Sequence, residues 1–138
     1  MTTAIDSNVL LDVYIGAGDL YSASASAMLA AFDLGDLVVC AAAYAEASAR
    51  FTSQRNFENF LEDHGVRLQP FARETCFAAG QMHKQYRAKG GKRERILPDF
   101  LIGAHALLQA DRLLTRDRGF YREYFPKLKI IDPTKRLK

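Results

Sequence analysis

The sequence predicts a three-layer α/β/α fold, in which helices cover both faces of a short, mainly parallel central sheet. Two observations predict it: short β-branched apolar runs alternate with segments of helical spacing, and glycines or prolines separate many of them. The chain has 138 residues, of which 49% are hydrophobic and 25% charged. This size and composition suit one domain with its own core, and the absence of a repeat or linker predicts a single domain over residues 1–138.

The elements of the first half follow from apolar spacing and from residues that begin and end helices. In chain order we predict a strand at 2–6, helices at 8–16 and 19–35, a strand at 36–41, and helices at 42–51 and 53–65. Asp19 and Ser53 are the expected N-caps of two of these helices. Gly16 and Gly35 end the first two, because glycine readily adopts the backbone conformation that stops a helix.

The second half continues the alternation. We predict a strand at 66–71, helices at 72–90 and 98–110, a strand at 111–117, a short helical segment at 119–126 and a strand at 128–132. Pro98 favours a helix start, because the first helical residues need no backbone N–H. The aromatic run 119–125 is predicted to pack in the core rather than to stack on bases.

Composition excludes several classes of protein. No apolar stretch approaches the roughly 20 residues that a membrane-spanning helix needs. No basic segment precedes the first apolar run, so no secretory signal is expected. Cys40 and Cys76 lie among apolar or small neighbours, which predicts buried free thiols rather than a disulfide. We therefore expect a cytoplasmic protein.

Charge is distributed unevenly along the chain. Residues 1–83 carry four basic and ten acidic side chains, whereas residues 84–95 carry six basic and one acidic. The segment 127–138 carries five basic side chains and one acidic. This pattern indicates a polyanionic partner that must also approach carboxylates, a conflict that metal ions would resolve. Solvated loops and tails explain the same basic residues equally well.

Four carboxylates are candidates for one site. Asp6 and Asp117 end predicted strands, and ligands of parallel sheets bind beyond the carboxyl ends of strands. Glu46 and Asp99 lie in helices that follow a strand or a loop. We expect Asp6 at the rim of the sheet, outside the core. Taken singly, Asp99 could complement its helix dipole, Glu46 could be a solvated position and Asp117 a turn residue.

Four carboxylates in one site repel one another. Two unit charges about 4 Å apart cost about 4 kcal/mol at an effective dielectric constant of about 20. A divalent cation removes this repulsion; otherwise raised pKa values and protonation must do so. Oxygen ligands fit Mg²⁺ or Mn²⁺ rather than zinc. Two such ions about 3.5–4 Å apart can activate a water and stabilise the leaving oxygen in phosphodiester hydrolysis.

The motifs "AIDSNVLLD", "AEAS", "LPDFLIGAHAL" and "LLTRDRGFY" together resemble the PIN domain, and most of all its VapC-type toxins of type II toxin–antitoxin modules. The family's acidic positions, which are its catalytic metal ligands, match Asp6, Glu46, Asp99 and Asp117. The family's polar positions beside these acids match Asn8 and Thr115, which would orient carboxylates or waters. Ser7 stands where threonine is frequent, and either residue offers a hydroxyl.

The resemblance implies a Mg²⁺-dependent endoribonuclease, with Mn²⁺ able to substitute. It also implies a homodimer and inhibition by a cognate antitoxin protein that covers the active site. The RNA would be a tRNA or another structured RNA, which proteins read mainly in single-stranded loops. Lys92, Arg93 and Arg95 of the basic loop could contact phosphates beside the cut, so binding should weaken as salt rises. His64, His83 and His105 are expected to be structural.

Two other functions remain open on the sequence. A haloacid dehalogenase-like phosphatase would need a second Asp two residues after the first, where this chain has Asn8. A non-catalytic RNA- or protein-binding module could use the same fold. Loss of acidic positions would favour that module, and all four are present.

Overall fold

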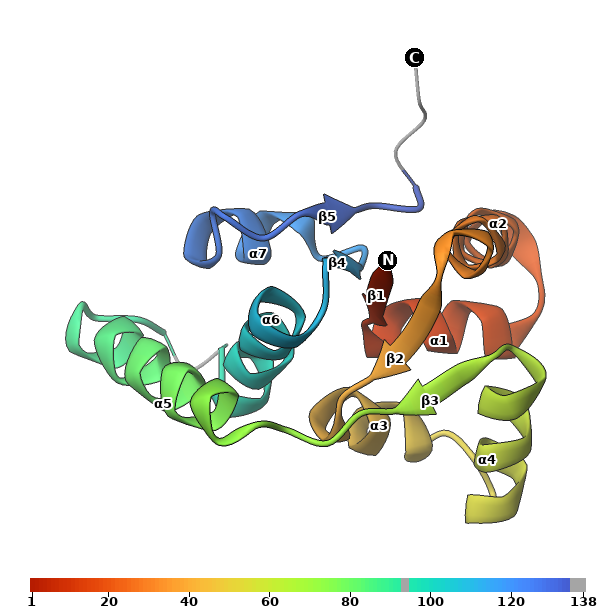
Figure 1. The fold of residues 1–138 in the computed structure, drawn as a ribbon, viewed down its shortest axis with the longest axis horizontal. Helices are drawn as coiled ribbons and strands as arrows, with labels where there is room; N and C mark the ends of the chain where they lie inside the picture. The colour runs from red at the N-terminus through yellow and green to blue at the C-terminus, as the bar shows by residue number, and fades with distance from the viewer. Residues whose placement is uncertain (93–94, 135–138) are drawn as a thin grey trace.

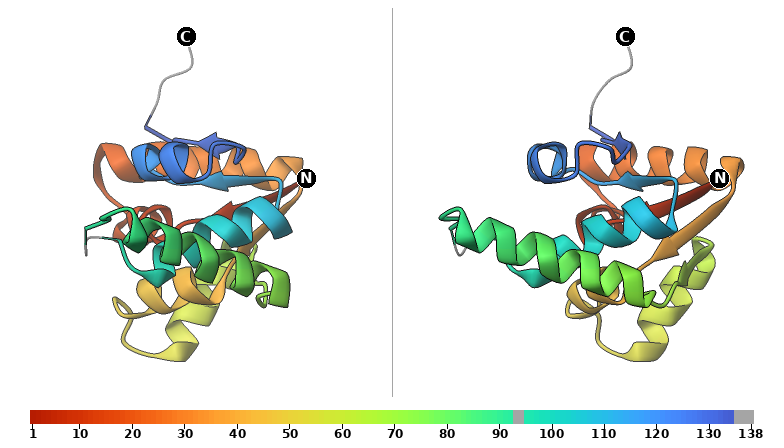
Figure 2. Two further views of the ribbon diagram at one scale, coloured as in Figure 1. Left: turned by 90° about the vertical axis from the view of Figure 1, so that its left-hand side faces the viewer. Right: turned by 60° about the vertical axis from the view of Figure 1, so that its left-hand side comes forward.

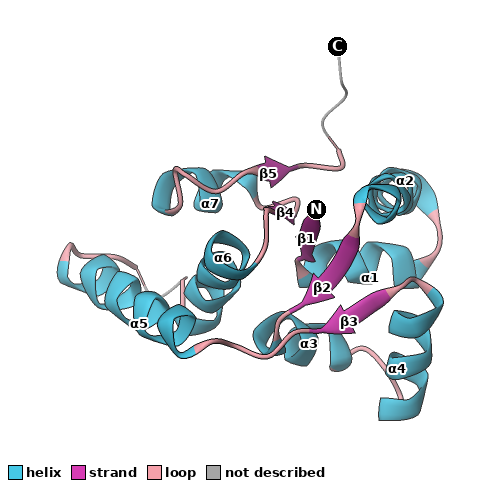
Figure 3. Ribbon diagram, in the orientation of Figure 1, coloured by secondary structure: helices cyan, strands magenta, loops and turns pink. Residues whose placement is uncertain are grey.

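The computed structural model of the protein describes residues 1–92 and 95–134. Within these ranges five parallel strands form one sheet in the order β3-β2-β1-β4-β5 (Figure 1, Figure 3). The strands are β1 (Thr2–Ile5), β2 (Asp36–Val39), β3 (Val66–Leu68), β4 (Arg112–Leu114) and β5 (Ile130–Ile131). Each lies inside a predicted strand, so the predicted parallel sheet is confirmed.

Helices pack on both faces of this sheet. They are α1 (Ser7–Ile15), α2 (Gly18–Leu34), α3 (Ala41–Ser48), α4 (Gln54–Asp63), α5 (Arg73–Ala88), α6 (Leu97–Gln109) and α7 (Arg118–Tyr124). Helices α1 and α2 lie on one side of the sheet and α5 and α6 on the other, which confirms the three layers (Figure 1, Figure 2). No helix in the described ranges is long and apolar enough to cross a membrane.

The strand order places a change of direction beside the central strand. From β1 the chain builds outward to β2 and β3, then crosses to the other side of β1 to form β4 and β5. Because the strands are parallel, their carboxyl ends share one edge, and the position where the order reverses is where such sheets bind ligands. The register pairs Ile5 with Leu114, so Asp6 and Thr115 leave neighbouring strands side by side.

The apolar residues of the central strands are buried. In β2, Leu37, Val38 and Val39 are each no more than 2% exposed, as expected for a strand covered by helices on both faces.

The helix ends agree with the sequence predictions in part. Ser53 caps α4 by accepting a hydrogen bond from the Asn56 N–H, as predicted. Asp19 is not the N-cap of α2: Ala17 is, and Asp19 lies in the first turn, where its charge suits the helix dipole.

The two cysteines differ in environment. Cys40 is buried after β2, and burial raises the pKa of its thiol to about 11, which keeps it protonated and unreactive. Cys76 is exposed, so its predicted burial is wrong. The prediction relied on its apolar neighbours in the chain, but adjacent residues of a helix point in different directions, so their burial does not extend to Cys76. Both thiols are free.

Gly103 permits close packing between α6 and the chain after α7. A Cβ atom there would overlap Cε2 and Cζ of Phe125, which is itself only 1% exposed. We predict that Gly103→Ala destabilises the protein by about 1–3 kcal/mol in urea unfolding, because the ring has nowhere to move. Gly80→Ala in α5, where nothing lies within 4 Å, is the control. It should stabilise by up to about 1 kcal/mol through helix propensity, and equal effects at the two sites would contradict the packing argument.

Candidate active site

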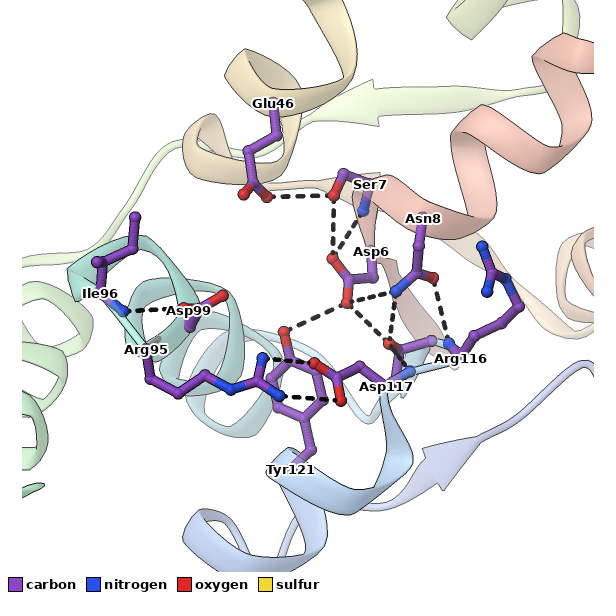
Figure 4. A network of polar contacts seen from close by, with 11 residues as sticks. Asp6, Ser7, Asn8, Glu46, Arg95, Ile96, Asp99, Arg116, Asp117 and Tyr121 are labelled. Atoms are coloured by element: carbon purple, nitrogen blue, oxygen red, sulfur yellow. Dashed lines mark hydrogen bonds and ion pairs between the residues drawn. The ribbon is translucent and has the colours of Figure 1, made fainter. Parts of the chain in front are cut away.

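Asp6 is the N-cap of α1, directly after β1 (Figure 4). It is only 4% exposed, so the expectation that it lies outside the core is wrong. Its Oδ1 accepts from the Ser7 N–H at 2.7 Å, and its Oδ2 accepts from the hydroxyls of Thr115 at 2.7 Å and Tyr121 at 3.3 Å. Burial raises the pKa of Asp6; these hydrogen bonds oppose the rise and the charge of Asp117 adds to it. The carboxylate is therefore held in place by neutral donors.

Thr115 and Asn8 hold the loop after β4 against Asp6. Asn8 Nδ2 lies 3.4 Å from Asp6 Oδ2 and 3.3 Å from Thr115 Oγ1. Its Oδ1 accepts from the Arg116 N–H at 3.1 Å, and Thr115 Oγ1 accepts from the Asp117 N–H at 3.0 Å. Both residues thus lie where a side chain can orient the carboxylates of Asp6 and Asp117.

Glu46 reaches the same place from α3. Its Oε1 accepts from the Ser7 hydroxyl at 3.1 Å, and that hydroxyl lies 3.4 Å from Asp6 Oδ1. Burial raises the pKa of Glu46, a hydrogen bond from Ser7 opposes this, and the charges of Asp6 and Asp99 raise it further. Ser7 therefore links two of the predicted carboxylates directly.

Asp117 precedes α7 and is paired with an arginine. Its Oδ2 lies 2.7 Å from Arg95 Nη1 and its Oδ1 3.4 Å from Arg95 Nη2. The guanidinium carbon of Arg95 also lies 4.5 Å from the centre of the Phe120 ring. In the structure Arg95, one of the residues predicted to contact phosphates, pairs with an acidic residue of the site.

Asp99 lies in the first turn of α6. Its Oδ2 accepts from the Ile96 N–H at 3.0 Å, which satisfies a free donor at the start of the helix. This is the structural role that the sequence left open. Its carboxylate also points toward the other acids (Figure 4), and its charge adds to the effect of burial in raising the pKa of Glu46. One of its two oxygens remains without a hydrogen bond from the described residues, so the capping contact leaves room for a second role.

The four predicted carboxylates point toward one region at the carboxyl edge of the sheet (Figure 4). Among the described residues, no three acidic, histidine or cysteine side chains already form a group that could enclose an ion. The donor set still fits Mg²⁺ in kind, because every candidate ligand is an oxygen. Burial raises the pKa values of Asp6 and Glu46 most, and a divalent cation would counter the mutual repulsion that adds to this rise.

Tyr121 is a part of the site that sequence reasoning missed. It lies four residues after Asp117 and is 2% exposed. Burial raises its pKa first, and the charges of Asp6, Asp99 and Asp117 raise it further. The phenol therefore stays protonated and donates to Asp6. Core packing of this aromatic segment was predicted correctly, but only helical spacing from Asp117 could have indicated the polar role.

A second acidic residue of α1 is stabilised separately. Asp12 is 5% exposed and accepts from Arg116 Nε at 2.7 Å, Arg116 Nη2 at 3.1 Å and the Ser24 hydroxyl at 2.8 Å. This ion pair joins α1, α2 and the loop after β4. It fixes the backbone beside Thr115 and keeps the Arg116 guanidinium away from the four carboxylates.

The remaining candidates lie outside the carboxylate region or outside the described residues. Lys92 is exposed, and Arg93 lies outside the described residues. His105 is 1% exposed and bonds to Gln69 Oε1 at 2.7 Å, and burial lowers its pKa to about 4. His64 bonds to the Phe60 carbonyl at the end of α4. These neighbours suit structural histidines.

Comparisons with known proteins agree with the fold described above. The fold is similar to that in a structure of VapBC-1 from nontypeable Haemophilus influenzae, with 22% identity, a TM-score of 0.71, and coverage of 98% of this chain and 100% of that one. It is also similar to that in VapBC2 from Rickettsia felis bound to a promoter DNA fragment, with 14% identity, a TM-score of 0.71, and coverage of 95% and 98%. A toxin–antitoxin complex from Klebsiella pneumoniae matches with 15% identity, a TM-score of 0.67, and coverage of 97% and 99%.

Sequence comparison identifies the family. No curated protein is similar enough in sequence to count as a match. The family model described as PIN domain matches residues 3–126, a span that includes all four carboxylates and every polar residue that contacts them. This match covers nearly the whole chain, and the protein therefore belongs to the PIN domain family.

Proposed function

We propose that this protein is a Mg²⁺-dependent endoribonuclease that acts as a VapC-type toxin. One observation carries the proposal: Asp6, Glu46, Asp99 and Asp117 come from four separate segments and turn toward one region where the strand order reverses. Membership of the PIN domain family and a fold shared with VapBC structures support it. Hydrolysis of a phosphodiester is the reaction that such a set of carboxylates serves best.

Each residue has a distinct part in the proposed reaction. Asp6 and Asp99 would hold the principal Mg²⁺ or Mn²⁺, and Glu46 and Asp117 would complete its shell or share that of a second ion. When bound, the metal supplies Lewis acidity, which lowers the pKa of water and stabilises charge on the leaving oxygen. Ser7, Asn8, Thr115 and Tyr121 keep the carboxylates oriented through the hydrogen bonds in Figure 4. No histidine is needed as a base.

The proposed substrate is RNA in the cytoplasm, with a tRNA or another structured RNA as the first to test. Lys92 is exposed, lies three residues before Arg95 in the sequence, and would contact phosphates outside the cut. Arg93, proposed for the same role, lies outside the described residues. Binding through such contacts weakens as salt concentration rises, because counterions are released from the phosphates.

The proposed protein partners are a cognate antitoxin and a second copy of this chain. The likeness to a toxin–antitoxin complex supports the antitoxin, and the resemblance to VapC-type toxins suggests the second copy. An antitoxin that covers the carboxylates would block access of RNA. In a bacterial host, expression of the chain should arrest growth, and expression of its antitoxin should restore it. Light scattering of the purified chain would determine whether it is a dimer.

The test is cleavage of total RNA by the purified chain with Mg²⁺, with Mn²⁺ or with EDTA. We expect cleavage with either metal and none with EDTA. Asp99→Asn should be inactive, whereas Asp33→Asn, a change at an exposed acid on α2, should cleave normally. Cleavage in EDTA or by Asp99→Asn at the wild-type rate would contradict the proposal. Metal-dependent release of phosphate from small phosphoesters, with RNA intact, would favour the phosphatase instead.

A further inference from the structure

Arg95 forms an ion pair with one of the four acidic residues, Asp117. Its guanidinium forms two contacts with Asp117, at 2.7 Å and 3.4 Å, and lies against the face of Phe120. Both partners of this ion pair are about one-third exposed, so it is neither fully buried nor free in solvent. The flat guanidinium matches both oxygens of the carboxylate at once, which makes the pair more specific than a lysine contact.

Arg95 is the counter-cation of the site in the part of the chain that the structure describes. Among the described residues, the Arg95–Asp117 contact is the only ion pair that involves one of the four carboxylates. Arg116 is bound to Asp12, and Arg118 lies 3.8 Å from Asp132. Burial lowers the pKa of Arg95, but the contact with Asp117 and the charge of Asp99 outweigh this, and the pKa is raised. Its positive charge therefore acts on two of the proposed metal ligands.

We propose that Arg95 competes with the divalent cation for Asp117: it holds this carboxylate until a metal binds, and coordination of the metal by Asp117 requires the Arg95–Asp117 ion pair to open. This inference rests on the proposed metal-dependent function. Nη1 and Nη2 contact both oxygens of Asp117, so a cation that approaches this carboxylate from the same side must displace the guanidinium. Two positive groups at one carboxylate also repel each other.

The release of Arg95 has a consequence for substrate binding. A guanidinium freed from Asp117 is a strong bidentate ligand for phosphate. Coupling between two binding events is reciprocal, so a phosphate that draws Arg95 away from Asp117 also favours the metal. The contact would thus keep metal affinity low in the absence of RNA and raise it when a phosphate arrives.

The experiment measures Mn²⁺ affinity of the full chain by electron paramagnetic resonance at fixed ionic strength and without RNA. Arg95→Gln should bind Mn²⁺ about fivefold more tightly than wild type. A change of this size in affinity corresponds to the stabilisation that a partly exposed ion pair provides. Arg95→Lys, which keeps the charge without the two-pronged contact, should lie between them. Arg118→Gln is the matched control: it removes a charge next to Asp117 that pairs with Asp132 instead, and it should stay within about twofold of wild type.

The outcomes separate the inference from the function on which it rests. If Arg95→Gln binds Mn²⁺ no more tightly than wild type or Arg118→Gln, Arg95 does not compete with the metal, and the metal site stands without it. If wild type and all variants fail to bind Mn²⁺ at millimolar concentration, the proposed metal-dependent function is overturned and the inference with it.

Discussion

Asp6→Asn should reduce Mg²⁺-dependent RNA cleavage by about a hundredfold or more. Removal of residues that only orient metal ligands already costs about 10–100-fold, and Asp6 is proposed as a ligand itself. Asparagine keeps the shape of the side chain, and its amide oxygen can still accept from Thr115. It lacks the negative charge that attracts the cation. Cleavage of RNA at saturating Mg²⁺, compared between the two proteins, measures the effect.

The same substitution should leave the protein at least as stable as wild type at neutral pH. Burial raises the pKa of Asp6 in the folded state. Above that pKa the ionised side chain therefore lowers the free energy of unfolding. As pH falls below the folded pKa, Asp6 becomes protonated in the folded state and the difference in unfolding free energy between wild type and Asp6→Asn should shrink, until it is lost below the pKa of the unfolded state. Urea unfolding at pH 7 and at low pH measures this. A stability loss at pH 7 would mean that Asp6 is a structural residue.

Asp36→Asn provides the matched control for activity. Asp36 begins β2, at the opposite end of the sheet from Asp6, and its side chain is 68% exposed in a pair with Arg67. The two substitutions remove the same charge from the same fold. If both lower cleavage equally, the loss comes from net charge rather than from a site at the carboxyl edge.

Element order could be predicted because local pattern and tertiary role agree in this chain. β2 reads as a buried strand in sequence and is buried between helices in the structure, and Ser53 caps α4 as its residue type suggests. The carboxylates could be predicted as a set because parallel strands bring their ends to one edge. None of that required knowledge of distant contacts.

The parts that could not be predicted depend on side chains that meet across the fold. The burial of Asp6 requires α1 to start immediately after β1 and Tyr121 to reach back from α7. The pairing of Arg95 with Asp117 joins residues 22 apart, and sequence identifies Arg95 only as one of several basic loop residues. Exposure of Cys76 depends on which side of α5 packs. Local patterns carry no information on such contacts.

The site depends on an aromatic cluster that joins α6 to α7, and Phe100→Ala tests that dependence. Phe100 is fully buried directly after Asp99, with its ring centre 5.3 Å from that of Phe120 and 5.4 Å from that of Tyr86. We expect a loss of about 3–5 kcal/mol in unfolding free energy, because the substitution removes apolar contacts and leaves a cavity. Urea unfolding followed by circular dichroism measures it.

Phe77→Ala separates this packing from the general effect of losing an aromatic ring. Phe77 lies on α5 and is 69% exposed, so its truncation should change unfolding free energy by less than about 0.5 kcal/mol. A similar loss of unfolding free energy at both positions would show that the packing of Phe100 in the cluster is not specifically required for stability. The expected contrast has a functional meaning: Phe100 belongs to the helix that carries Asp99, and its ring packs against Phe120 of the helix that follows Asp117. The positions of two proposed metal ligands therefore depend on the same buried side chain that stabilises the fold.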